Sequence, residues 1–337
     1  MLTVVILFLW ASILLYILLG GADFGAGILE LLSPPGERTI TRQLTFRAIG
    51  PIWEANHMWL VITVVILFVG FPSIYATVST YLHIPLLILL LGIVARGTAL
   101  SFRSNDAIKD DLQRVYSRVF IAASVITPFF LGIIAGSIVA GNIDPAANDF
   151  RNAYLYSWLR WFPLATGLFT QCICAWLASI YLIGRSDTEE DKRIFIHHTV
   201  IAHIVVLVSG ILLFLAATAD NVPLRAWISG NVVSLLAILA AVLGYILIWF
   251  MLLLRLTSII NIPAVFMVTM LFLSVTCGLF PNVVLLKNGV TLSLTALAGR
   301  QSITDLGWAL LIGGLLIFPA LFYLIYIFDG RTKETSL

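Results

Sequence analysis

Two carboxylates stand inside the first apolar segment of the chain, where a lipid bilayer would surround them. Asp23 and Glu30 are seven residues apart, so on a helix they share one face, about 10 Å apart along its axis. An acid at the centre of a membrane span costs about 2.5–3.5 kcal/mol and therefore tends to face a partner, a cavity or a proton path. We predict such a role for both acids. The alternatives are helix packing for Asp23 and a place at the membrane interface for Glu30.

Small residues surround these acids. Gly21 and Gly25, like Ala22 and Ala26, are four residues apart, a spacing that lets a second membrane helix approach closely. The sequence therefore predicts a tight helix contact in this part of the first span.

The second apolar segment begins with further polar residues. Trp53, Glu54, Asn56 and His57 fall in its first turns. An acid there is favoured by the helix dipole, which is the structural explanation for Glu54. The functional explanation is that Glu54 collects protons at the cytoplasmic boundary and passes them toward Asp23.

One arginine lies within the third apolar segment. Arg96 precedes Arg103 by seven residues, so it is on the same helix face and about 10 Å deeper. It either extends to the lipid headgroups or pairs with an acid such as Glu54 or Asp23 and holds it ionised. We expect Arg96→Leu to damage folding or proton access more than Arg103→Leu.

The composition is that of a polytopic membrane protein. Of the 337 residues, 61% are hydrophobic and 11% are charged. We predict an all-α protein with a single transmembrane domain over 1–337, in which two four-helix bundles are joined by one peripheral helix. Nine segments are long enough to cross the hydrocarbon: 2–32, 51–71, 80–103, 118–140, 160–184, 197–219, 230–256, 262–280 and 304–328.

Basic residues in the connecting loops predict the orientation. Thirteen fall on one side: Arg38, Arg42, Arg47, Arg103, Lys109, Arg114, Arg118, Arg185, Lys192, Arg193, Arg255, Arg331 and Lys333. The other side has Arg151, Arg160, Arg225, Lys287 and Arg300. The first side is therefore cytoplasmic, and nine spans place the N-terminus outside and the C-terminus inside a cytoplasmic membrane. The basic residues are spread over loops, so no nucleic-acid partner is expected.

The remaining candidate ligands do not form a familiar site. The three cysteines lie within apolar spans and have no zinc-binding spacing, so no metal site is predicted. Two histidines from facing helices could hold a haem, and only His57 and His203 have roughly matching depth. We expect no haem ligation by this chain, and no complete catalytic site. Any redox chemistry would then belong to a partner.

Several motifs together resemble subunit II of cytochrome bd-type quinol oxidases. Residues 23–27 (DFGAG) are similar to that family's DGFDLGVG, and residues 49–60 (IGPIWEANHMWL) to its IGPxWDGNxVWL. Residues 71–76 (FPSIYA) are similar to its FPxxYA. Two further parts of the chain are more weakly similar to family motifs: residues 96–97 together with 102–104, and residues 291–295 together with 302–304. The similarity is dense over about 20–105.

The resemblance implies a haem-free subunit paired with a haem-bearing subunit I in a heterodimer. That complex oxidises quinol, reduces O₂ to water, and carries haems b558, b595 and d in subunit I. This chain would stabilise its partner and supply a cytoplasmic proton pathway through Asp23, Glu54, Glu30 and His57. Trp53, Asn56, Arg96 and Arg103 would support it. The resemblance leaves open whether a quinone, lipid or small accessory subunit also binds here.

Three positions depart from the family pattern. Gly20 and Ser101 stand where the family has acids, and Ala55 stands where it has glycine. Either the proton route runs through Glu30, His57 or water, or it lies in the partner. Two other functions fit the polar residues: a secondary transporter that uses Asp23 and Glu54, and a non-catalytic assembly factor.

Overall fold

The computed structural model describes residues 1–49, 53–104, 111–186, 188–295 and 299–334. The helices are α1 (Leu2–Leu15), α2 (Gly21–Leu32), α3 (Arg38–Ile49), α4 (Trp53–Gly70), α5 (Pro72–Tyr81), α6 (His83–Ser104), α7 (Asp111–Val139), α8 (Trp161–Ile183), α9 (Glu189–Ala219), α10 (Leu224–Ser229), α11 (Val232–Leu253), α12 (Asn261–Leu279) and α13 (Arg300–Glu334). Two π-helical turns, η1 (Tyr16–Gly20) and η2 (Arg151–Leu155), and two strands, β1 (Asn282–Leu285) and β2 (Thr291–Ser293), complete the fold.

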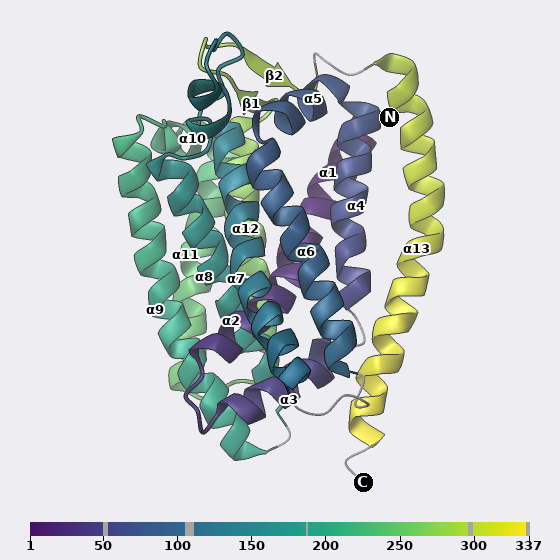
Figure 1. Ribbon diagram of the computed structural model, residues 1–337, viewed down its shortest axis with the longest axis vertical. Coiled ribbons are helices and arrows are strands. Elements are labelled where there is room, and N and C mark those ends of the chain that lie inside the picture. Colours follow the sequence, from purple (N-terminus) through teal and green to yellow (C-terminus); the bar gives the residue numbers. More distant parts are fainter. Residues whose placement is uncertain (50–52, 105–110, 187, 296–298, 335–337) are drawn as a thin grey trace.

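The predicted all-α membrane fold is confirmed. Eight helices within the described ranges are long and apolar enough to cross a membrane, and they match the first eight predicted spans. The ninth predicted span lies in α13, which runs alongside the other helices for most of their length (Figure 1). Two helices begin well before their predicted starts: α7 at Asp111 rather than residue 118, and α9 at Glu189 rather than residue 197. Helix α13 also begins earlier, at Arg300 rather than residue 304. The predicted start of the second span at residue 51 is outside the described residues.

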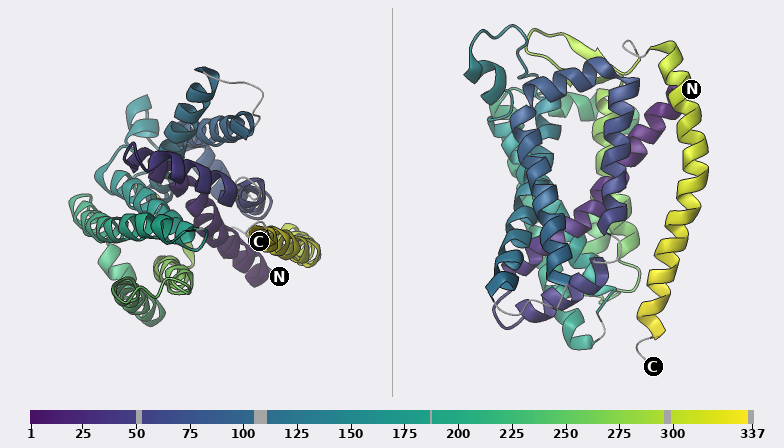
Figure 2. Two further views of the ribbon diagram at one scale, coloured as in Figure 1. Left: turned by 90° about the horizontal axis from the view of Figure 1, so that it is seen from below. Right: turned by 45° about the vertical axis from the view of Figure 1, so that its right-hand side comes forward.

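The helices form two groups with one helix at the edge. The first group contains α1, α2, α4, α6 and α7, and the second contains α8, α9, α11 and α12. Helix α13 lies against α1 and α4, apart from the second group (Figure 2). Because α1 and α2 form one span, this is the predicted arrangement of two four-helix bundles and a peripheral helix.

Helix α2 is wedged between the two groups, against α7 and α8. A Cβ atom at Gly25 would come within 1.8 Å of the Cys174 carbonyl oxygen, and one at Gly27 within 2.2 Å of the Ser124 hydroxyl. Only glycine permits these contacts, so the predicted close approach is confirmed. The wedge buries both carboxylates of α2.

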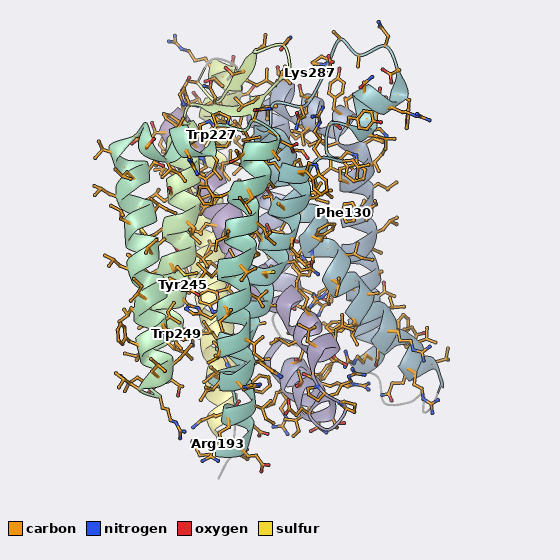
Figure 3. All side chains as sticks on the ribbon, turned by 90° about the vertical axis from the view of Figure 1, so that its left-hand side faces the viewer. Phe130, Arg193, Trp227, Tyr245, Trp249 and Lys287 are labelled. Carbon is orange, nitrogen blue, oxygen red and sulfur yellow. The ribbon has the colours of Figure 1, made fainter. Side chains whose placement is uncertain are left out.

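One end of the bundle carries a small β-hairpin that the sequence analysis did not predict. Strands β1 and β2 are antiparallel, and a bridge between Ile143 and Leu286 ties the hairpin to the loop after α7. Lys287 lies at this end and Arg193 at the opposite end (Figure 3). The two residues were predicted to be on opposite sides of the membrane, and the N-terminus and the last turn of α13 also lie at opposite ends (Figure 1). Which end faces the cytoplasm stays a prediction.

Candidate functional site

The carboxylate of Asp23 forms a buried ion pair with Arg96. Both side chains are essentially inaccessible, at 1% and 0% exposed. The guanidinium donates from Nη1 to Oδ2 at 2.7 Å and from Nη2 to Oδ1 at 2.6 Å, a bidentate geometry. It also donates to the Asp23 backbone carbonyl at 2.8 Å and to Ser124 Oγ at 3.0 Å. Arg96 thus pairs with Asp23, and the alternatives of headgroup contact and pairing with Glu54 are wrong.

A second ion pair lies seven residues further along both helices. Arg103 Nη2 donates to the two carboxylate oxygens of Glu30 at 2.7 and 2.9 Å, and both side chains are buried. Phe120 on α7 lies between the two arginines, with each guanidinium carbon 4.9 Å from its ring centroid. Glu30 is therefore buried in an ion pair, and its place at the membrane interface stays a prediction.

These two ion pairs link α2 to α6 at two positions along the helices. Every carboxylate oxygen of Asp23 and Glu30 already accepts from a guanidinium, so a proton could be added only by breaking an ion pair. Buried charges of opposite sign are costly to separate, since removal of one leaves the other uncompensated. The geometry is that of a structural clamp, and no direct bond in the described chain links either acid to Glu54.

Glu54 and His57 instead line a lateral groove between α4 and α6. The groove has a volume of about 630 Å³ and is lined by Trp53, Glu54, His57, Ile93, Val94, Gly97, Thr98, Ser101 and Phe102. Glu54 is exposed, whereas His57 is half-buried. The Trp53 ring covers Gly97, where an added Cβ would lie 2.9 Å from it. The groove brings together two of the four predicted pathway residues.

Asn56 points away from this groove. Its Nδ2 atom donates to the Leu19 carbonyl at 3.5 Å, in the π-helical turn η1. Asn56 and Asp23 line a smaller apolar cavity of about 260 Å³, whose other walls include Tyr181, Ala264 and Asn261. Glu54 and Asp23 therefore line different cavities, and proton transfer between them stays a prediction.

The histidines do not form an opposed pair. His57 contacts the rings of Tyr16, Phe24 and Trp53, all within the first group of helices. His203 is stacked on Tyr245 of α11, with centroids 3.8 Å apart, and Trp249 lies beside them (Figure 3). The described residues contain no cluster of three or more histidine, cysteine or acidic side chains that could hold a metal ion. His57 and His203, the two histidines of roughly matching depth, thus pack in different groups of helices.

Comparison with known proteins decides the family. The family model described as "Cytochrome bd terminal oxidase subunit II" matches residues 1–328. The chain belongs to this family. The resemblance found in the motifs is therefore confirmed over almost the whole chain.

Two curated relatives show how far sequences diverge within the cytochrome bd subunit II family. The cytochrome bd ubiquinol oxidase subunit 2 of Bacillus subtilis (strain 168) is 33% identical over 147 residues, which is 41% of this chain and 42% of the relative. The cytochrome bd-I ubiquinol oxidase subunit 2 of Escherichia coli (strain K12) is 22% identical over 197 residues, 56% of this chain and 51% of the relative. The chain spans about half the length of the curated relatives it matches.

A solved structure supports the fold of this subunit II chain. It superposes on a chain of the bd oxidase from Geobacillus thermodenitrificans with a TM-score of 0.77 and 18% identity, over 97% of this chain and 98% of the other. At this identity the likeness shows the fold alone.

The sequence analysis missed several residues of this region. Ser124 and Phe120 of α7 contact the arginines, and Tyr16 packs against His57. The analysis also missed the pairing of Arg103 with Glu30, although the sequence carries a signal for it. Asp23 and Glu30 have the same seven-residue spacing as Arg96 and Arg103. For Ser124, Phe120 and Tyr16 the sequence offers no comparable signal.

Proposed function

We propose that this chain is the haem-free subunit II of a quinol:oxygen oxidoreductase of the cytochrome bd type. The observation that carries the proposal is the family match over residues 1–328. The partner is a haem-bearing subunit I, which binds haems b558, b595 and d, oxidises quinol and reduces O₂ to water. The membrane-spanning helices and the absence of an opposed histidine pair among the described residues support this division of labour.

Within this complex the chain has two tasks. The first is to stabilise subunit I, and the two buried ion pairs serve it by fixing α2 against α6. The second is to admit protons from the cytoplasm through the groove of Glu54 and His57. An exposed carboxylate beside a half-buried imidazole suits proton uptake, since the first exchanges with water and the second has a ring nitrogen that can accept a proton.

The pathway therefore starts at Glu54 and continues at His57. Asp23 and Glu30 act as fixed charges beside it, because each is already bound to an arginine. This departs from the route expected from the motifs, in which all four residues carry protons. Trp53 closes the groove over Gly97 and keeps α4 and α6 at this spacing.

The first test is purification of the tagged chain from its native membrane. We expect a larger haem-containing protein to co-purify and the preparation to consume O₂ when supplied with a quinol. A colourless chain without a partner, taken from intact membranes, would contradict the assignment.

The second test is Glu54→Gln in the assembled complex, which removes the titrating group at nearly constant volume. General acid–base groups contribute about 10²–10⁴-fold to rate, so turnover should fall by at least about tenfold at neutral pH. Glu189→Gln is the matched control, since that exposed acid pairs with Lys192 near the start of α9 and does not line the groove. Normal turnover by Glu54→Gln would refute the proposed entry point.

A further inference from the structure

His57 lies beside a group of buried polar atoms that have no partner in the described structure. Both of its ring nitrogens and the Tyr16 hydroxyl are buried and make no hydrogen bond to the protein. The two ring centroids are 6.0 Å apart. Such unpaired groups are rare in folded proteins and usually indicate an ordered water or a functional site. Three such atoms close together therefore indicate that a hydrogen-bonding molecule binds between Tyr16 and His57.

The surroundings leave these atoms little choice of partner. The rings of Phe24 and Trp53 pack against His57 at 5.8 and 6.0 Å, and neither presents a hydrogen-bond acceptor. Tyr16 and Phe24 are also in edge contact, at 6.2 Å. A water molecule needs two or more polar partners, and the Tyr16 hydroxyl and the His57 ring nitrogens are buried polar groups on neighbouring rings. A water shared by the two side chains would satisfy both of them.

Two local features place Tyr16 in this position. It is the first residue of η1, and π-helical turns are frequent at functional sites because they shift side chains out of the regular helical register. Its ring also lies over Gly20, where an added Cβ would be 3.1 Å from two ring carbons. Gly20 is the position at which the family motif has an acid. The missing carboxylate thus leaves the space that the Tyr16 ring occupies.

We propose that Tyr16 is a positioning residue for proton uptake, which holds one ring nitrogen of His57 through a bound water. This inference rests on the proposed proton entry at Glu54. With one nitrogen engaged by the water, the other is left to accept the proton from Glu54, which lines the same groove as His57. The Glu54 carboxyl O–H bond breaks as the N–H bond at that nitrogen forms, which gives a carboxylate and an imidazolium. The imidazolium then releases the same proton to the next acceptor, and the ring returns to its starting tautomer.

The test is Tyr16→Phe in the purified complex, compared with Tyr245→Phe. Tyr245 is the matched control, because its hydroxyl donates to the His203 carbonyl in the second group of helices, away from the groove. We expect Tyr16→Phe to lower quinol-driven O₂ consumption by about tenfold at neutral pH, the factor of one ordinary hydrogen bond. The loss should shrink as the pH falls, because proton supply then becomes easier. Tyr245→Phe should keep the wild-type rate and pH profile.

A second variant keeps the Tyr16 hydroxyl but changes its position. Gly20→Ala forces the Tyr16 ring to shift by a few tenths of an ångström. We expect it to reproduce the pH profile of Tyr16→Phe in milder form. A high-resolution map of the wild-type complex should also show a water within hydrogen-bond distance of both Tyr16 Oη and a His57 nitrogen. This map decides the matter even where a variant fails to assemble.

The outcomes separate the inference from the function on which it rests. If Glu54→Gln is impaired while Tyr16→Phe has the wild-type rate and pH profile, the role of Tyr16 is refuted and proton entry at Glu54 stands. If Glu54→Gln is also unimpaired, proton entry at Glu54 and the positioning role of Tyr16 are both refuted. A wild-type map with no water between the two side chains refutes the positioning role directly.

Discussion

Removal of the Arg96 side chain should be among the most damaging single changes in the chain. In Arg96→Met the buried Asp23 loses the two guanidinium hydrogen bonds to its carboxylate, and the bond to its backbone carbonyl is lost as well. Breaking a buried ion pair by deletion of one partner costs about 3–5 kcal/mol. We therefore expect a loss of about 3–5 kcal/mol in the free energy of unfolding, measured by titration of the purified complex with SDS in mixed micelles.

The double variant Asp23→Leu/Arg96→Met should recover most of this loss. Replacement of both members of a buried pair by apolar groups is often neutral or stabilising. Asp23 borders an apolar cavity of about 260 Å³, which has room for the larger leucine side chain. Methionine keeps contact with the rings of Phe24 and Phe120, between which the Arg96 guanidinium lies at 5.0 and 4.9 Å.

Arg103→Met provides the comparison. Arg103 makes two hydrogen bonds, both to Glu30, and lies near the end of α6, whereas Arg96 makes four. Hydrogen bonds to charged groups contribute about 1.5–3 kcal/mol, so this variant should lose less than Arg96→Met. The reasoning is refuted if Arg96→Met unfolds at the wild-type SDS fraction, or if the double variant is no more stable than Arg96→Met.

Two further predictions concern other parts of the fold. Gly25→Ala should sharply reduce the amount of assembled complex in membranes, because its Cβ would collide with the Cys174 carbonyl, whereas Gly21→Ala meets its nearest atom at 3.4 Å and should assemble normally; quantitative immunoblotting measures both. At the hairpin end, a hydrogen bond from Lys287 Nζ lowers the pKa of Asp144, so the tie between them is present at neutral pH and is lost as the pH falls through that lowered pKa. The protection of the amides of residues 143–149, that is, the intrinsic exchange rate relative to their observed rate at the same pH, should therefore fall at acidic pH in the wild type, and Lys287→Gln should abolish this loss of protection.

Much of the architecture follows from the sequence because a bilayer imposes it. Apolar runs of fixed length give the spans to within a few residues, and glycine spacing gives the close contact of α2. The starts of α7 and α9 are harder, since their polar first turns carry no hydropathy signal. The turn η1 also escapes prediction, because the residues of Tyr16–Gly20 are ordinary for a membrane helix.

The pairing of charges shows where sequence reasoning stops. The two acids of α2 and the two arginines of α6 have the same spacing in the sequence. This spacing predicts two ion pairs between the helices once α2 and α6 are known to pack side by side. Which acid Arg96 meets depends on how α2 and α4 are rotated against α6, and that rotation is decided by packing against α7 and α8. Asp23 and Glu54 are therefore equal candidates until the fold is known.

The separation of clamped acids from a free one follows from the physics of the membrane interior. A proton carrier must exist in both charge states, and a fixed guanidinium beside it favours only one of them. Asp23 and Glu30 are both bound in this way, whereas Glu54 faces a groove wide enough for water. The same arginines that would disable a proton carrier hold α2 against α6, since loss of one member of a buried ion pair leaves the other uncompensated. The contacts of each acid thus separate the two proposed roles, because Asp23 and Glu30 are each held by an arginine and Glu54 lines the open groove.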